Sequence, residues 1–227
     1  MTPSEFGTLD PRIPVVAVDV AVFTVLGGEL KVLLVRVKKR PYTGIWALPG
    51  GIICSDESLE EAAYRELAEK TGLKSVYLEQ LFTFGDVNRD KTRRAISTVY
   101  FALVNAEGLK LKTTEKYAGM EWFSVKKLLR LAYDHANVVR YAVKRLRWKL
   151  EYTNVAWSLL QRAFTLTELQ SAYESILGKK LDKRNFRKKI LSLKLLTATG
   201  KMKRLGAHRP AELYRFKTRK PVIVKVL

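Results

Sequence analysis

The chain has 227 residues, of which 47% are hydrophobic and 28% charged, and its formal net charge is +20. This length suits two domains, and the composition excludes collagen-like and largely disordered proteins. Cys54 is the single cysteine, which excludes an internal disulfide, and no apolar stretch approaches the roughly 20 residues that span a bilayer. Residues 1–14 lack the basic-then-apolar order of a signal peptide. We therefore expect a cytoplasmic protein with no membrane partner.

The positive charge is concentrated in the last third of the chain. Residues 1–144 hold 21 basic and 17 acidic side chains, whereas residues 145–227 hold 21 basic and 5 acidic ones. Such an uneven distribution favours a polyanionic partner. A solvated lysine-rich surface and a surface that binds anionic membranes are alternatives that charge alone leaves open.

The first half of the chain contains patterns typical of strands. Apolar, β-branched runs predict strands over 15–25 and 29–37, on either side of Gly27-Gly28. Later strands are expected over 79–84, 95–103 and 120–123, and helices over 125–131 and 138–150. This order predicts a mixed sheet between helices.

A helix is predicted from Ser58, where Glu61 completes a capping box, to Gly72. Its spacing gives a buried stripe of Leu59, Ala62, Ala63, Leu67 and Ala68. The same spacing places Glu66, Glu69 and Lys70 together on an outward face.

Residues 51–73, which include this helix, read G-x5-E-x7-R-E-L-x-E-K-x-G-L. The segment resembles the Nudix box, G-x5-E-x7-R-E-U-x-E-E-x-G-U with U aliphatic, and eight of nine fixed positions match. The preceding residues 46–50, W-A-L-P-G, resemble the segment that leads into that box. The resemblance implies an α/β fold, a Nudix α/β/α sandwich with a mixed sheet. In such a box, carboxylates on one helix face bind Mg²⁺, which holds a diphosphate.

One position of the box departs from the pattern. The resemblance places Glu66 and Glu69 at metal-ligand positions, but Lys70 stands where the family has another glutamate. The change removes a ligand and places an ammonium near the metal. We therefore expect weak Mg²⁺ binding, no required cofactor and little hydrolysis by the residual box of Gly51, Glu57, Arg65, Glu66 and Glu69. In the alternative, Lys70 turns to solvent and Glu57 or Glu115 replaces the lost ligand. Arg65 is expected to orient the carboxylates.

Candidate ligand-binding residues lie on the strands and loops around the box. They are Arg36, Trp46, Glu57, Phe84 and Arg89.

The basic C-terminal segment has a helix-turn-helix pattern. Thr167 and Gln170 are spaced as a capping box for a first helix that ends at Gly178, and Asp182 is a suitable N-cap for a second helix that runs to about Leu193. Two short helices with a glycine-containing turn are typical of this DNA-binding unit.

The second helix has one apolar side and one cationic side. Phe186, Ile190 and Leu193 should face the core, which leaves the cationic side for a DNA groove. Strands over 195–198 and 211–216 bracket a basic loop that resembles the wing of a winged helix and is suited to phosphate contact. The DNA-binding candidates are Lys183, Arg184, Asn185, Arg187, Lys188, Lys201, Lys203, Arg204, His208 and Arg209.

The arrangement as a whole resembles the Nudix-related transcriptional regulators, in which a Nudix domain senses a metabolite and a winged helix binds operator DNA. Beyond the box, the segments that carry the resemblance are 86–90, 134–135, 164–170, 182–188 and 210–214. It implies a homodimer. Acidic residues thin out near residues 151–154, and we place there the boundary between a ligand-sensing domain over 1–150 and a winged helix-turn-helix domain over 151–227. The implied effector is ADP-ribose, a related NAD metabolite or a sugar. Residues 218–227 lie outside the pattern.

The leading hypothesis is a metabolite-responsive regulator that binds double-stranded DNA. Its rival is an active Mg²⁺-dependent pyrophosphatase of ADP-ribose or another nucleoside diphosphate derivative, which the intact Glu57, Arg65, Glu66 and Glu69 support. An RNA-directed Nudix protein is a third alternative, but the basic half lacks an aromatic-rich platform for single strands.

Overall fold

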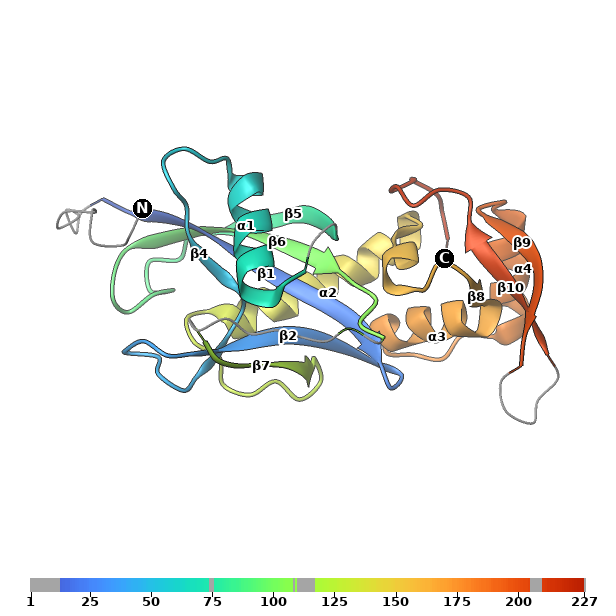
Figure 1. Ribbon diagram of the computed structural model, residues 1–227, viewed down its shortest axis with the longest axis horizontal. Helices are drawn as coiled ribbons and strands as arrows, with labels where there is room; N and C mark the ends of the chain where they lie inside the picture. Colours follow the sequence, from blue (N-terminus) through green and yellow to red (C-terminus); the bar gives the residue numbers. More distant parts are fainter. Residues whose placement is uncertain (1–12, 74–75, 108, 110–116, 205–209, 227) are drawn as a thin grey trace.

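The computed structural model of the chain describes residues 13–73, 76–107, 109, 117–204 and 210–226 (Figure 1). Its first strands are β1 (Val15–Leu26), β2 (Glu29–Val37), β3 (Trp46–Ala47) and β4 (Gly50–Ile52), which are followed by helix α1 (Leu59–Thr71). Next come β5 (Tyr77–Phe84), β6 (Ala95–Leu103), β7 (Tyr117–Ser124), helix α2 (His135–Tyr152) and the 3₁₀ helix η2 (Val155–Leu159). The last elements are β8 (Phe164–Thr165), α3 (Leu166–Leu177), α4 (Lys183–Ser192), β9 (Leu196–Lys203) and β10 (Ala211–Phe216).

A mixed sheet forms the first part of the molecule. Its strand order is β3-β2-β1-β6-β5, and β4 also pairs with β1 and β7 with β2. β1 runs parallel to β6, from Val15 opposite Ala95 to Phe23 opposite Leu103, and antiparallel to β2. The mixed sheet predicted from the order of the elements is therefore confirmed.

Helices cover both faces of this sheet, and the side chains of β1 serve both faces in turn. Val18, Val20 and Val22 pack in one hydrophobic cluster with Leu67 of α1. Ala21 and other residues of β1 belong to a second cluster that contains the apolar side of α2. Because alternate side chains of a strand point to opposite faces, the largely apolar β1 is buried on both. The fold is the predicted α/β/α sandwich.

The C-terminal part is a winged helix. A three-stranded antiparallel sheet of order β8-β10-β9 packs beside α3 and α4, beyond the C-terminal end of α2 (Figure 1). Tyr173 of α3 contacts Phe186 of α4 with ring centroids 5.3 Å apart. The cluster that contains α2 continues into this part through Leu169, Tyr173 and Phe216. The two parts therefore share one hydrophobic core, and α2 ends at Tyr152, among the residues where the boundary is predicted.

The helix predicted over 125–131 is wrong. These residues form a turn and a loop, and Leu131 makes a bridge to Trp46. A helix of seven residues gains too few hydrogen bonds to offset the cost of nucleation. The burial of Leu131, which is 6% exposed, favours the extended bridge instead.

Two details of the winged helix also differ from the prediction. The capping box of α3 is Thr165 with Glu168, two residues before the predicted pair, because Thr165 ends β8 with an extended backbone at the start of the helix. β9 reaches Lys203 rather than ending at Ala198, because its pairing with β10 continues to Ala211. Residues 199–203 of the predicted loop therefore belong to β9.

The C-terminal tail, residues 218–226, lies along the junction between α2 and η2. Val224 donates its N–H to Tyr152 O at 2.9 Å, and Val226 donates to Glu151 O at 2.8 Å. Asn154 accepts from the N–H of Val222 through its side chain, also at 2.8 Å. Val226 is fully buried, so the tail closes the hydrophobic core where the two parts meet.

None of the helices in the described part of the chain is long and apolar enough to cross a membrane.

Candidate functional site

Helix α1, which carries the box, begins and ends as predicted. Ser58 accepts the N–H of Glu61, and Glu61 accepts the N–H of Ser58, so the capping box is complete. Gly72 ends the helix in the left-handed conformation, with φ of 71°. Such a conformation strongly favours glycine. The caps hold the box helix at a fixed position against β1.

Arg65 organises the carboxylates of the box. Its Nε and Nη2 donate to the two oxygens of Glu57 at 2.7 and 2.5 Å, and its Nη1 donates to Glu66 Oε1 at 2.7 Å. The hydrogen bonds from Arg65, helped by the N–H of Cys54, lower the pKa of Glu57 to about 2. Arg65 therefore orients two glutamates, as predicted.

Lys70 is buried, and so is its partner Glu66. Each is 5% exposed, and Lys70 Nζ forms an ion pair with Glu66 Oε2. The prediction of an outward face is therefore wrong for Glu66 and Lys70, whereas the side chain of Glu69 is 43% exposed as predicted. The alternative in which Lys70 turns to solvent is also wrong. Burying a single charge is costly, but the two opposite charges neutralise each other, so both side chains can be buried together.

Gly51 makes room for the Glu66 carboxylate. A Cβ atom at Gly51 would lie 2.3 Å from Glu66 Oε1, so a side chain there would displace the Glu66 carboxylate from its present position. The glycine of the box therefore lets this carboxylate lie against the loop.

The residues of the box do not fit a magnesium ion as they stand. Mg²⁺ requires negatively charged or neutral oxygen ligands, but both oxygens of Glu66 are occupied by Arg65 and Lys70. Glu57 is bound by Arg65, and Glu69 Oε2 lies 4.0 Å from the same guanidinium. Among the described residues, no group of three or more His, Cys, Asp or Glu side chains could hold a metal ion. Glu115, the other proposed substitute ligand, lies outside the described residues.

A buried polar network lies on the other side of Gly50. Arg89 donates to Asp134 at 2.9 and 3.2 Å and to Asp19 at 3.3 Å. Asp19 also accepts from Ser97 at 2.6 Å and lies 3.5 Å from His135 Nε2. Burial raises the pKa of Asp19, but these partners outweigh burial and hold the pKa far below its usual range.

Arg89 was predicted to bind ligand, but the structure places it inside this network, where it is 6% exposed. The sequence prediction missed Asp19 and Ser97. Asp19 carried a usable signal, because it is an isolated acidic residue within the apolar strand β1.

The network connects the box loop to α2. His135 Nδ1 accepts the N–H of Leu48, two residues before Gly50, at 2.9 Å. His135 is also the first residue of α2, after the N-cap Asp134. The box loop is therefore hydrogen-bonded to the start of the helix that leads into the winged helix.

The remaining predicted ligand residues lie at separate places. Arg36 is exposed on β2 and donates to Gly44 O at 3.2 Å, and its register partner Trp46 packs edge-on against Phe123. Phe84 instead packs against Tyr141 of α2, with ring centroids 5.8 Å apart. Its role in the structure is therefore to contact α2, whereas Arg36 and Trp46 are neighbours on adjacent strands.

Helix α4 presents the predicted cationic side. Asp182 caps it by accepting the N–H of Asn185 at 2.8 Å, and Phe186 and Ile190 are buried. Of the predicted DNA-binding residues on this helix, the exposed ones are Lys183, Arg184, Asn185 and Lys188. Arg187 is partly buried and donates to Thr167 of α3 at 3.1 Å, so part of its guanidinium holds the two helices together.

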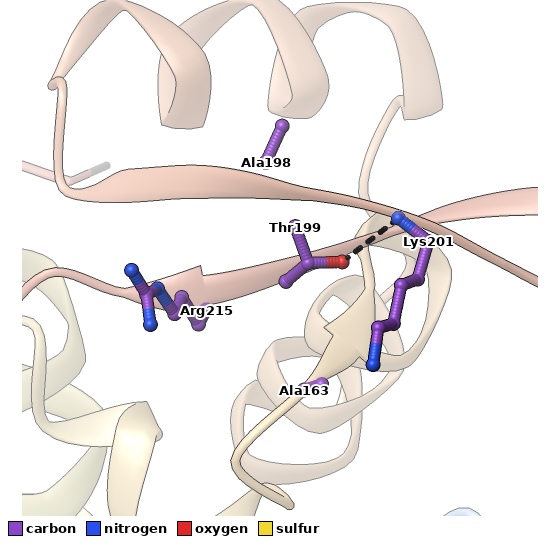
Figure 2. A pocket seen from close by; sticks show the side chains of 5 residues that line it. All are labelled: Ala163, Ala198, Thr199, Lys201 and Arg215. Atoms are coloured by element: carbon purple, nitrogen blue, oxygen red, sulfur yellow. Dashed lines mark hydrogen bonds between the residues drawn. The ribbon is translucent and has the colours of Figure 1, made fainter.

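The wing strands carry further cations. Lys201 and Arg215 line an open hollow of about 380 Å³ together with Thr199, and these three side chains project from the same face of the sheet (Figure 2). Lys203 differs, because it pairs with Glu168 of α3 at 2.6 Å. Arg204 is exposed. His208 and Arg209 lie outside the described residues.

Comparison with known proteins supports both halves of this description. The NUDIX domain family matches residues 15–145, and the NrtR DNA-binding winged helix domain matches residues 156–216. The "ADPR responsive transcriptional repressor NtrR" of Acinetobacter baylyi is 39% identical over 207 residues, which cover 89% of this chain and 82% of the relative. The chain belongs to the NrtR family.

Two solved structures extend the NrtR likeness to the arrangement in space. The crystal structure of Shewanella oneidensis NrtR complexed with a 27mer DNA has a TM-score of 0.79 and 36% identity, and the match covers 89% of this chain and 93% of that one. The NUDIX domain of the same protein complexed with ADP ribose has a TM-score of 0.55 and 34% identity, over 64% of this chain and 99% of that one. The Nudix fold followed by a winged helix is therefore a shared NrtR architecture.

Proposed function

We propose that this NrtR-family chain is a DNA-binding transcriptional repressor of the cytoplasm whose Nudix domain binds ADP-ribose and thereby alters operator affinity. The proposal draws on the relatives described as responsive to, or complexed with, ADP-ribose and DNA. It also draws on the structure itself, in which the box retains its helix and loop while Glu66 is neutralised by Lys70. Hydrolysis by this box is weak or absent in our proposal.

The observation that carries the proposal is the continuous connection from the box to the winged helix. The start of α2 is joined to the box loop through His135 and Leu48. Further along the same helix, Arg147 donates to Ile176 O, at the end of α3, at 2.9 Å. A ligand can change DNA affinity only if it favours one arrangement of the protein over another. Helix α2 provides a physical route for such a preference.

The proposed assembly is a homodimer that binds a two-fold symmetric operator. Each winged helix offers one recognition helix, α4, to one major groove, and symmetric dimers bind half-sites one or two helical turns apart. The domain boundary near residue 150 and the DNA-contact roles of Lys183, Arg184, Asn185, Lys188, Lys201 and Arg204 belong to the same proposal.

The test combines two measurements on the full chain. Operator DNA is first selected from fragmented genomic DNA, and its affinity is then measured by fluorescence anisotropy with and without ADP-ribose. Hydrolysis of ADP-ribose with Mg²⁺ is followed in parallel. We expect an ADP-ribose-dependent shift in DNA affinity and turnover far below about 1 per second, the lower end of typical enzymes. Efficient turnover without an effect on DNA would favour the pyrophosphatase alternative.

A further inference from the structure

The ion pair between Lys70 and Glu66 lies at the centre of the box. The side chains of both residues are 7% exposed. Arg65 approaches the other oxygen of Glu66 at 2.7 Å, so this carboxylate has a cation on each side. In the box pattern, position 70 carries a glutamate, and the cation in the site is a metal ion. Here the protein itself supplies a cation from that position.

The charges of the box are largely balanced without any metal. Arg65 binds Glu57 through two hydrogen bonds and also bonds Glu66, and Lys70 neutralises Glu66 from the opposite side. A diphosphate approaching uncompensated carboxylates would be repelled, and a divalent cation ordinarily removes that repulsion. In this chain two side-chain cations already oppose the charges of Glu57 and Glu66, and Glu69 lies 4.0 Å from Arg65.

The ammonium is held firmly in this position. Lys70 Nζ lies 5.4 Å from the centroid of the Tyr117 ring, a cation–π distance. Its charge is balanced by the Glu66 carboxylate, with which it forms the ion pair. On the other side, the Glu66 carboxylate occupies the space that a side chain at Gly51 would need. The pair is therefore formed before any ligand binds.

We propose that Lys70 takes the place of the divalent metal ion of a Nudix box, so that the diphosphate of ADP-ribose binds to this box without Mg²⁺. Lys70 acts through Glu66 and is a positioning residue, since its buried ammonium is closed off from solvent. The proposal rests on the proposed function, because it concerns the same ligand and the same site. It adds that the chain senses its ligand independently of the concentration of divalent metal.

The first test uses the unaltered full chain. ADP-ribose is titrated into it by isothermal calorimetry, once with EDTA and once with excess MgCl₂. We expect affinities that agree within about twofold, a small free-energy difference. Binding that requires MgCl₂ would overturn this inference and leave the proposed function standing. No binding in either buffer would overturn both.

Three variants separate charge balance from packing. Lys70→Met leaves Glu66 buried beside Arg65 alone, and we expect its affinity for ADP-ribose in EDTA to fall by at least about tenfold. The double variant Lys70→Met/Glu66→Gln removes both charges, and it should regain most of that affinity without metal. Lys70→Glu should bind ADP-ribose with MgCl₂ but not with EDTA. Unchanged affinity of Lys70→Met in EDTA, or a double variant no better than it, would contradict the proposal.

A direct measurement of metal binding needs no ADP-ribose. Mn²⁺ added to the protein loses its free-ion electron paramagnetic resonance signal when it binds. The wild-type protein should leave that signal unchanged at Mn²⁺ concentrations at which Lys70→Glu reduces it. Equal binding of Mn²⁺ by the two proteins would overturn the proposal. Melting curves followed by circular dichroism show whether each variant is folded.

Discussion

Arg89 and Asp134 form a buried ion pair that joins the loop between β5 and β6 to the start of α2, with Arg89 Nη2 2.9 Å from Asp134 Oδ1. The same guanidinium reaches Asp19 on β1 at 3.3 Å. A single side chain therefore connects the sheet, the loop that follows β5 and the helix that enters the winged helix. Because both carboxylates are largely buried, the stability of the folded protein depends on this cation to neutralise them.

Replacing Arg89 by methionine should strongly destabilise the protein. The variant leaves Asp19 and Asp134 without their cation, and removing one partner of a buried pair typically costs about 3–5 kcal/mol. Denaturant unfolding of the full chain measures the change. Arg93→Met is a matched control, because Arg93 is exposed in the same loop. Equal stabilities for the two variants would show that the network is not structurally important.

The stability of the fold should fall in acid because of Asp19. Its pKa is held below the usual range in the folded protein, so its contribution is fully present above its unfolded pKa of about 4 and is lost as the pH falls further. The Asp19→Asn variant should be less stable than the wild-type protein at pH 7. Its stability should also fall less than that of the wild type as the pH drops below 5. Melting temperatures measured over this range test the prediction. Parallel curves for variant and wild type would exclude Asp19 as the source.

Arg184 should contribute to operator recognition. Arg184→Ala removes an exposed cation from α4 and should weaken specific DNA binding by about 1–3 kcal/mol if the side chain reaches a base. Lys127→Ala, which removes one exposed charge from the first domain, is the control. Arg187→Ala should lower both DNA affinity and stability, because Arg187 also bonds Thr167. If anisotropy finds the same operator affinity for Arg184→Ala and the control, α4 does not read the DNA.

The C-terminal tail should stabilise the junction between the two parts. Val226 is fully buried there, whereas Ile223, three residues earlier, is 85% exposed. Val226→Asp should therefore lower the free energy of unfolding by more than the 1.5–3 kcal/mol or so that a buried valine contributes. Ile223→Asp introduces the same charge and should have little effect. Similar unfolding curves would mean that the tail does not close the core.

The sequence predicted those elements whose signals are local. The caps of α1 at Ser58 and Gly72, the N-cap of α4 at Asp182 and the apolar run of β1 each depend on neighbouring residues, and each is found as predicted. The Nudix and winged helix resemblance was confirmed because its motifs specify both the residues and their context.

The errors arose where distant contacts decide the structure. Residues 125–131 lost their predicted helix because Leu131 pairs with Trp46, a contact across most of the first domain. Lys70 was placed on an outward face because helical spacing alone cannot show that Gly51 and Tyr117 cover that face. The network of Asp19 and Arg89 joins residues 70 positions apart, and no local pattern reveals such a pair.

The central claim is that ADP-ribose binding and operator binding are coupled within one chain, and a reciprocal titration tests it most directly. ADP-ribose affinity is measured by calorimetry with and without operator, and operator affinity by anisotropy with and without ADP-ribose. Thermodynamic linkage requires the two ratios to be equal, and we expect a factor of about 5–150, which corresponds to about 1–3 kcal/mol. If the protein binds both ADP-ribose and operator DNA but neither ligand changes the affinity for the other, the account is contradicted.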